Sequence, residues 1–448
     1  MLQDHRGLTV STASATALAH FERALGQFHA YRGDPIATID AALAEDDAFV
    51  LAHLFKAFVL ATTSEGRHLP AARNAVARAA EFGHRANARE RALIAAGQQL
   101  VDGQWHAASR GFDAVLREWP RDALALQTAH LMDFFRGDAL NLRNRVSRVL
   151  PAWSATLPGY SYVLGMHAFG LEECNQYAEA EATGRRALEI VPTDGWAVHA
   201  VTHVMEMQGR IDEGIGWLTT READWATDDN AFAPHNWWHL ALFHMDRGAF
   251  DAALDLYDRK LDGPQADTLL VLIDCTALLW RLQLEGVDVG DRFERIADRW
   301  HGKAIEERSF YAFNDLHAMM SFAATRRSAD CERLLAEMRT TAASGTGVNQ
   351  LMTRDIGLPL SEGMLAFAQG RPVRAIECID PVRDTANGFG GSHAQRDLLT
   401  LTVIEGAIRA GEIARARHLL AERQVHKPTT WSARLAARAN AAAWPAAA

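Results

Sequence analysis

A short turn pattern recurs along the chain and constrains the fold more than any other feature of the sequence. A Gly or polar residue is followed by an aromatic or aliphatic residue, an acidic or polar pair and a small residue. The pattern begins at seven positions: Gly103, Gly137, Asn175, Gly209, Gly248, Gly370 and Gly411. The first five starts are separated by 34, 38, 34 and 39 residues. This period is typical of tetratricopeptide repeats, in which two helices pack around a tight turn.

The segments that follow two of these turns match the second helix of such a repeat. Small and apolar residues recur at helical spacing before a proline: Ala108, Phe112, Val115 and Pro120 in one segment, and Ala180, Gly184, Ala187 and Pro192 in the other. Small residues let two helices approach closely, and proline cannot continue a helix. Helical periodicity covers nearly all of the remaining chain, and no segment shows convincing strand alternation. We therefore expect an all-α tetratricopeptide-repeat α-solenoid, a strongly curved superhelix of about ten helix pairs.

The linkers between the expected helices are short, so the sequence predicts one domain. The solenoid is expected to span residues 1–430, followed by an Ala-rich C-terminal tail at residues 431–448 that is either a frayed helix or disordered. An exposed last helix at Trp431 would favour a homodimer.

The charge of the chain narrows the expected partners. The formal net charge is −10, and the basic residues are spread along the chain. This predicts that neither nucleic acid nor an anionic membrane surface is the main partner. The four cysteines have no CxxC spacing, the N-terminus has no apolar signal segment, and no stretch approaches a membrane span of roughly 18 apolar residues. We expect a soluble cytoplasmic protein.

Two consecutive repeats carry histidines four residues apart in their first helices. His199 and His203 lie in one repeat, and His235 and His239 lie in the next. Because a helix has about 3.6 residues per turn, each pair lies on one face of its helix. Glu206 extends the first pair by another turn. Since the first helices of stacked pairs line the inner wall of a superhelix, the four imidazoles are expected to converge there.

Three interpretations of this histidine cluster remain open. Imidazoles and a carboxylate are suitable ligands for zinc, iron or manganese, and the tentative metal set is His199, His203, Glu206 and His239. Alternatively, these groups serve as acids, bases and hydrogen-bond donors to a polar ligand, with Trp237 or Trp238 as an apolar wall. In the third interpretation they are buried structural histidines bonded to neighbouring backbone and carboxylate groups.

Other polar residues in apolar surroundings have both a functional and a structural explanation. Asp274 interrupts the segment LLVLIDCTALLW and is either a structural hydrogen-bond anchor or a pocket acid with a raised pKa. Asn314, Asp315 and His317 begin an otherwise apolar helix, where helix capping by Asn314 or Asp315 is the simpler explanation. His393 and Arg396 follow the turn GFGGS at a predicted helix N-terminus, which suits an anion but is also explained by an N-cap serine.

Several strings resemble the tetratricopeptide repeat protein 38 family. The resemblance is carried by HAVTHVMEMQGR, HNWWHLALFHMDRG, FNDLHAMM and GGSHAQRD, and it runs from about Leu124 to Ala410. It implies an all-helical tetratricopeptide fold but no settled biochemical activity. The motif positions that it implies are His199, His203, Glu206, His235, Asn236, His239, Asp315, His317, Arg396 and Asp397.

Our leading hypothesis is a ligand-binding or scaffold protein for a small polar molecule or a peptide end. Its expected binding residues are His199, His235, Asn236, Trp238, Asp315, His317, His393 and Arg396. The alternative is an enzyme that uses metal-assisted or acid–base chemistry, with His203, His239, Glu206 and Asp274 as catalytic residues. A pure protein–protein adaptor is the third hypothesis. No nucleophile motif such as GxSxG or a Walker loop is present in the sequence.

Overall fold

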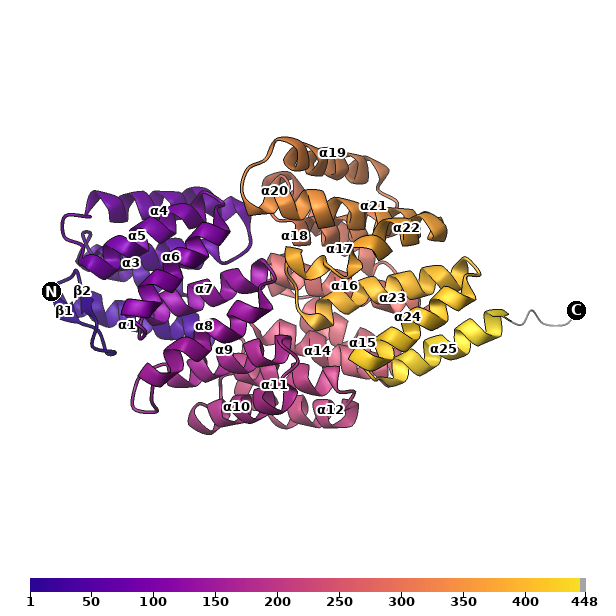
Figure 1. Cartoon of the computed structure of the whole chain (residues 1–448), viewed down its shortest axis with the longest axis horizontal. Helices are drawn as coiled ribbons and strands as arrows, with labels where there is room; N and C mark the ends of the chain where they lie inside the picture. The colour runs from indigo at the N-terminus through magenta and orange to yellow at the C-terminus, as the bar shows by residue number, and fades with distance from the viewer. Residues whose placement is uncertain (444–448) are drawn as a thin grey trace, which may run out of the picture. The chain divides into compact units, whose positions relative to one another are not determined.

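The computed structural model describes residues 1–443, apart from the side chains of residues 264, 265, 442 and 443. The contacts within the chain define two compact units. The first unit comprises Met1–Val201 and Ala223–Ala233, and the second comprises Thr202–Glu222 and Pro234–Ala448. The boundary falls inside one continuous helix, α11 (Gly195–Met207), so this helix contributes residues to both units. Each unit consists almost entirely of helices (Figure 1).

The first unit begins with a short antiparallel hairpin of β1 (Leu2–Gln3) and β2 (Thr9–Val10), in which Leu2 pairs with Val10. No alternating pattern predicts this hairpin, because strands of two residues are too short to show one. The helices that follow are α1 (Ala15–Ala30), α2 (Pro35–Glu45), α3 (Val50–Ala61), η1 (Gly66–His68), α4 (Leu69–Glu81), α5 (Ala88–Val101), α6 (Trp105–Glu118), α7 (Ala123–Phe135), α8 (Ala139–Val149), η2 (Leu150–Ala152), α9 (Tyr160–Glu173) and α10 (Tyr177–Ile190).

The helices after α11 lie mainly in the second unit. They are α12 (Ile211–Thr220), α13 (Glu222–Trp225), α14 (Ala233–Asp246), α15 (Phe250–Leu256), η3 (Tyr257–Leu261), η4 (Pro264–Asp267), α16 (Leu269–Leu284), α17 (Arg292–Glu307), α18 (Ala312–Ala324), α19 (Ser328–Ser344), α20 (Val348–Met352), η5 (Thr353–Gly357), α21 (Leu358–Ala368), α22 (Pro372–Arg383), η6 (Ala386–Phe389), α23 (His393–Arg409), α24 (Ile413–His426) and α25 (Thr430–Ala443). Among residues 1–443, no helix combines the length and apolar composition needed to cross a bilayer.

Eleven helix pairs follow one another in the part of the chain that the structure describes, from α1–α2 to α23–α24. Most of the turns between paired helices hold a glycine with positive φ, for example Gly103 at 74° and Gly411 at 74°. Glycine adopts this left-handed conformation without the steric cost that a Cβ atom brings. The prediction of an all-α solenoid of helix pairs is confirmed.

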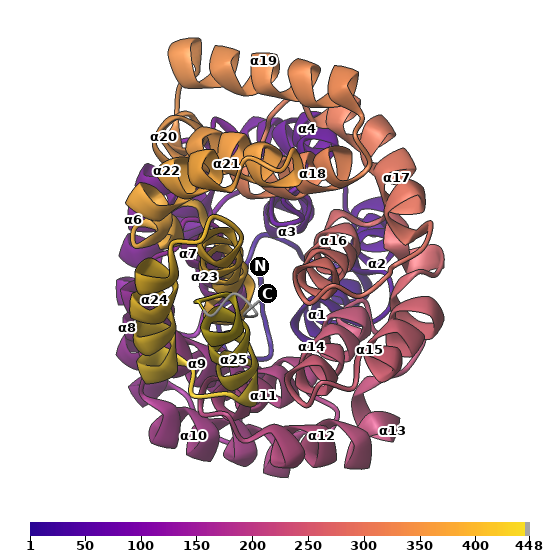
Figure 2. The ribbon, with the colours of Figure 1, turned by 90° about the vertical axis from the view of Figure 1, so that its right-hand side faces the viewer.

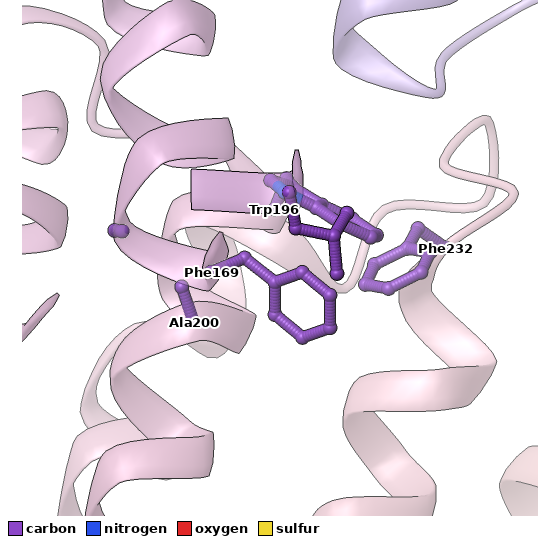
Figure 3. Close-up of a cluster of buried hydrophobic side chains, with 6 residues drawn as sticks. Phe169, Trp196, Ala200 and Phe232 are labelled. Atoms are coloured by element: carbon purple, nitrogen blue, oxygen red, sulfur yellow. The ribbon is translucent and has the colours of Figure 1, made fainter. Parts of the chain in front are cut away.

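The core of the first unit forms where small residues let helices approach closely. Phe169, Trp196 and Phe232 pack together beside Ala200 (Figure 3). The ring centroids of Phe169 and Trp196 are 5.0 Å apart, and those of Trp196 and Phe232 are 5.1 Å apart. In the same unit, a Cβ atom on Gly170 would lie 2.5 Å from the backbone of the preceding helix α8, so only glycine fits there.

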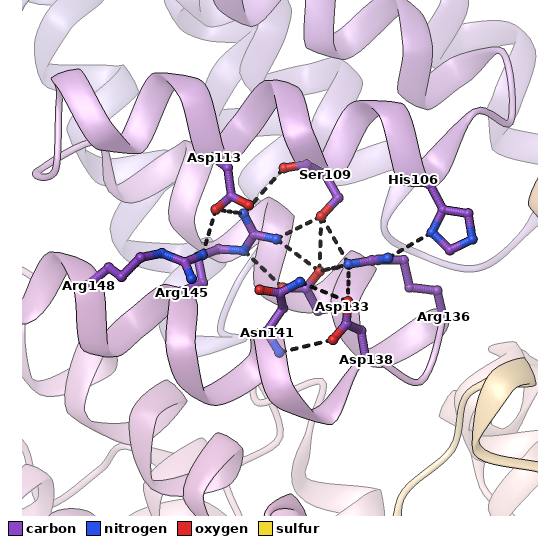
Figure 4. A network of polar contacts seen from close by, with 9 residues as sticks. All are labelled: His106, Ser109, Asp113, Asp133, Arg136, Asp138, Asn141, Arg145 and Arg148. Carbon is purple, nitrogen blue, oxygen red and sulfur yellow. Dashed lines mark hydrogen bonds and ion pairs between the residues drawn. The ribbon is translucent and has the colours of Figure 1, made fainter. Parts of the chain in front are cut away.

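A buried polar network joins α6, α7 and α8 in the first unit (Figure 4). The Arg145 side chain is fully buried and donates from Nε to Asp133 at 2.9 Å and from Nη1 to Asp113 at 2.6 Å. Its Nη2 donates to the hydroxyl of Ser109 at 2.7 Å. Since every partner of this guanidinium comes from a neighbouring helix, the network fixes the packing of these helices.

The last helix of the second unit, α25, covers residues 431–443 of the segment expected to be an Ala-rich tail, for which a helix was one of the two alternatives. Its first turn is fixed by Asp246 at the end of α14. The indole nitrogen of Trp431 also donates to Glu285 at 2.6 Å. Trp431, Leu435 and Ala439 are buried along one face of this helix, and residues 444–448 lie outside the described residues.

Candidate functional site

The two histidine pairs lie on α11 and α14 and are buried. The exposed fractions are 2% for His199, 0% for His203, 5% for His235 and 0% for His239. The start of α11 is fixed by Asp194, whose Oδ1 accepts the backbone N–H of Ala197 at 3.0 Å. With so little exposure, these imidazoles interact with interior groups or with an enclosed ligand rather than with open solvent.

The rings of His203, His235 and His239 lie next to one another in the second unit. The ring centroids of His203 and His239 are 4.5 Å apart, and those of His235 and His239 are 4.9 Å apart. One ring nitrogen of each of these three histidines lies within 4.8 Å of the other two. His199 lies one turn before His203 on α11, in the part of this helix that belongs to the first unit.

Two buried carboxylates orient two of these rings. Nδ1 of His239 donates to Oε2 of Glu206 at 2.7 Å, and Nδ1 of His235 donates to Oδ2 of Asp274 at 2.8 Å. A proton on Nδ1 leaves the lone pair on Nε2. Burial, together with the neighbouring rings, lowers the pKa of His239 well below its usual value, so the ring is neutral. Burial raises the pKa of Asp274, although His235 opposes this shift.

A chain of buried ion pairs continues from Glu206. Its second oxygen, Oε1, lies 2.5 Å from Nζ of Lys427, which follows α24. Nζ of Lys427 is also 3.4 Å from Asp397 of α23, and both oxygens of Asp397 accept from Arg423 at 2.8 Å. Burial alone would raise the pKa of Asp397, but Arg423 and Lys427 lower it below its usual value. Both oxygens of Glu206 thus have partners within the protein.

Trp238 and Arg281 form one wall of the cluster. The Trp238 ring stacks on His235 with a centroid distance of 5.3 Å and an interplanar angle of 14°. Arg281 of α16 lies 5.4 Å from the centroid of the Trp238 ring and donates to the backbone oxygen of Ala394 at 2.7 Å. Burial lowers the pKa of Arg281 to about 10.

Asp315 and His317 of α18 form hydrogen bonds with groups outside this cluster. Asp315 accepts from the hydroxyl of Ser309 at 2.8 Å, and burial raises its pKa to about 7. His317 bonds through Nδ1 to the backbone oxygen of Phe313 at 2.8 Å, and burial lowers its pKa to about 4. Helix α18 has its N-cap at Tyr311, so neither Asn314 nor Asp315 is the capping residue.

The residues predicted after the glycine turn begin α23. His393 is the first residue of this helix, and Ser392 caps it with Gln395 in a capping box, as the simpler explanation of this segment required. Arg396 is half-buried and donates to the backbone oxygen of Gly391 in its own turn. Asn236 is fully buried on α14, next to His235 in sequence. The roles predicted for these side chains stay predictions.

Two charged residues of the cluster were missed by the sequence analysis. Arg281 is seven residues after Asp274 in the same apolar helix and therefore on the same face, so the reasoning that selected Asp274 applied to it as well. Lys427 had no local signal, because its partner Glu206 is 221 residues away in sequence.

The chain is similar in fold to solved helical structures. No protein-family model matches the chain. A human IFIT1 dimer with m7Gppp-AAAA is 12% identical, with a TM-score of 0.44 over 97% of this chain and 96% of that chain. A human IFIT1 dimer with PPP-AAAA is 12% identical, with a TM-score of 0.42 over 99% and 98%. The TPR domain of P58(IPK) is 13% identical, with a TM-score of 0.21 over 92% and 99%.

These structures correct one prediction about partners. The sequence analysis excluded nucleic acid because the chain is acidic, whereas the similar IFIT1 structure contains the capped RNA m7Gppp-AAAA. The exclusion was wrong, since a nucleic acid contacts a local surface and net charge is a sum over the whole chain. The capped RNA belongs to the IFIT1 structure, and an identity of 12% does not extend RNA binding to this chain.

Proposed function

We propose that this helical-repeat protein is a ligand-binding protein whose histidine cluster holds a divalent metal ion. The observation that carries this proposal is the placement of three ring nitrogens of the second unit, one from each of His203, His235 and His239, within 4.8 Å of one another. Histidine is the commonest protein ligand for such ions, and a buried neutral imidazole needs no proton removed before it coordinates.

The spacing of the rings supports an ion rather than an organic molecule between them. With metal–nitrogen bonds of about 2.1 Å, two imidazoles on one metal have ring centroids roughly 4.6 Å apart at a right angle and roughly 5.3 Å apart at the tetrahedral angle. The observed separation of 4.9 Å falls in this range, and the separation of 4.5 Å lies at its lower end. The same rings are too close for a flat organic ligand to lie between them.

The carboxylates have a supporting role in this proposal. Metal-bound histidines usually donate their second N–H to a carboxylate, as His239 does to Glu206 and His235 does to Asp274. Because both oxygens of Glu206 are already bonded, we move it from the predicted ligand set to this outer position. The remaining ligands are all imidazoles, which suit zinc or iron better than manganese.

The direct test is metal content by plasma mass spectrometry on protein purified without a nickel column. We expect near-stoichiometric zinc or iron in the wild type and a loss of that metal in His203→Ala/His239→Ala. His317→Ala is the matched control, because His317 is also a buried histidine of the second unit but lies outside the histidine cluster. Equal metal content in the wild type and the double variant would refute the proposal.

The alternative is that the cluster binds a small polar molecule or a peptide end through hydrogen bonds. Wild type without metal, combined with a thermal shift by such a compound that His203→Ala removes, would support it. In either case, if the protein turns over a substrate, we propose as catalytic residues His203, His239, Glu206 and Asp274. Membership of the tetratricopeptide repeat protein 38 family, a cytoplasmic location and a homodimer are further proposals that rest on the sequence alone.

A further inference from the structure

A cavity of about 430 Å³ lies in the second unit, away from the histidine cluster. The C-terminal ends of α16, α18, α21 and α23 surround it. Helix α16 contacts α18 and α23, and α18 contacts α21. Figure 2 shows α18 beside α21. Trp280 and Phe367 line the cavity with ring centroids 5.8 Å apart, and its charged lining residues are Asp288, Arg326 and Arg409.

Arg326 stands where the neighbouring repeats have glycine. The turns after α16 and α21 have Gly286 at a φ of 79° and Gly370 at a φ of 71°, and the turn after α18 has Arg326 at a φ of 56°. Residues with a side chain rarely adopt this left-handed conformation. An unfavourable residue at one turn of a repeat, beside a cavity, is a sign of function rather than of stability.

The fold does not need the side chain of Arg326 to complete the helix end. The backbone N–H groups of Arg326 and Arg327 donate to the oxygens of Ala323 and Phe322 at 3.2 Å and 2.9 Å, which completes the cap of α18. Within residues 1–443, no hydrogen bond or ion pair involves the guanidinium of Arg326. This exposed cation is therefore available to a ligand in the cavity.

The other lining groups have fixed positions that suit an anion with an apolar part. Arg409 is held by Glu405 at 2.8 Å and lies 4.8 Å from the centroid of the Phe367 ring. The indole nitrogen of Trp280 donates to Thr402 at 3.1 Å, which fixes this ring as a wall. The acid in the lining, Asp288, accepts from the backbone of Gly290 in its own turn at 2.9 Å.

We propose that this cavity is a binding site for a small organic anion, in which Arg326 and Arg409 pair with a carboxylate or phosphate group while the apolar part of the ligand contacts Phe367 and Trp280. A guanidinium donates two parallel hydrogen bonds to either kind of anion. The proposal is independent of the metal site, because no residue of the histidine cluster lines this cavity.

The test compares benzoate, phenyl phosphate and the uncharged benzamide by isothermal titration calorimetry. We expect at least one of the two anions to bind at least tenfold more tightly than benzamide, and the preferred anion identifies the head group. Arg326→Gly is expected to weaken anion binding at least tenfold while leaving the melting temperature unchanged or higher, since glycine suits the left-handed turn.

The matched control is Arg308→Gly. Arg308 is another exposed arginine in the left-handed conformation, at a φ of 49° after α17, and it does not line the cavity. This variant should gain stability in the same way and bind the anion as the wild type does. Equal affinity for benzamide, no binding of either anion, or full binding by Arg326→Gly would each overturn the proposal.

Discussion

Lys427→Met tests how strongly the C-terminal segment is held to the histidine cluster. The Lys427 and Glu206 side chains are 7% and 3% exposed, with Nζ and Oε1 2.5 Å apart. Removing one partner of a buried ion pair costs about 3–5 kcal/mol, because the remaining charge stays out of water. Glu206 keeps its bond from His239, and Asp397 keeps both bonds from Arg423, so we expect a loss near the lower limit, about 3 kcal/mol.

The assay is urea unfolding, monitored by far-UV circular dichroism. The free energy of unfolding is calculated with the same dependence on urea concentration for every variant. Adding Glu206→Gln to Lys427→Met removes both charges and should recover part of the loss, because no carboxylate is then left unpaired. Arg259→Met breaks an exposed pair with Asp255 and should cause no measurable change. A loss below about 1 kcal/mol in Lys427→Met, or a double variant as unstable as the single one, would refute the reasoning.

Three further predictions test other parts of the structure. Burial raises the pKa of Asp315 to about 7, so the unfolded chain releases this proton first as the pH rises. The wild type should therefore lose up to about 4 kcal/mol of stability between pH 4 and pH 7, and Asp315→Asn should show a flatter profile in unfolding experiments. Glu206→Gln should weaken metal binding about 10- to 100-fold in a chelator competition, because His239 loses a charged acceptor; unchanged affinity would remove Glu206 from the site. Gly170→Ala should cost about 1–3 kcal/mol by forcing α8 and α9 apart, whereas Gly216→Ala, which meets no atom within 4 Å, should be neutral or stabilising in thermal unfolding.

The helix pairs were predictable from sequence because their signals are local. The turn glycines at Gly103 and Gly209 and the small residues at Ala180 and Gly184 form patterns that are complete within the sequence of one repeat, and a regular period makes each repeat a check on the others. The hairpin β1–β2 and the packing of α25 were not predictable in this way. The alanines of α25 are low in complexity, and their order depends on Asp246 and Glu285, far away in the chain.

The candidate site was predictable to the extent that helix geometry determines it. The spacing of His235 and His239 places both on one face of α14, and an isolated acid in an apolar helix marked Asp274 as buried. Sequence spacing shows which residues share a face of a helix, but it does not show which groups their side chains bond to. The bonds of Glu206 to His239 and Lys427 therefore emerged only from the folded structure. The prediction that excluded nucleic acid failed for a related reason, since the total charge of a chain does not give the charge of a local surface.

The bond between Lys427 and Glu206 has a consequence for how the protein is made. These residues are 221 positions apart, so the helix that carries His203 leaves the ribosome long before its partner exists. At typical synthesis rates of 5–20 residues per second, the interval is about 10–45 s. During this time Glu206 and the nearby rings lack their final neighbours, and the second unit completes its folding only after α24 has been synthesised. The bond from Lys427 therefore forms late in synthesis, and a ribosome that stalls before residue 427 leaves Glu206 without this partner.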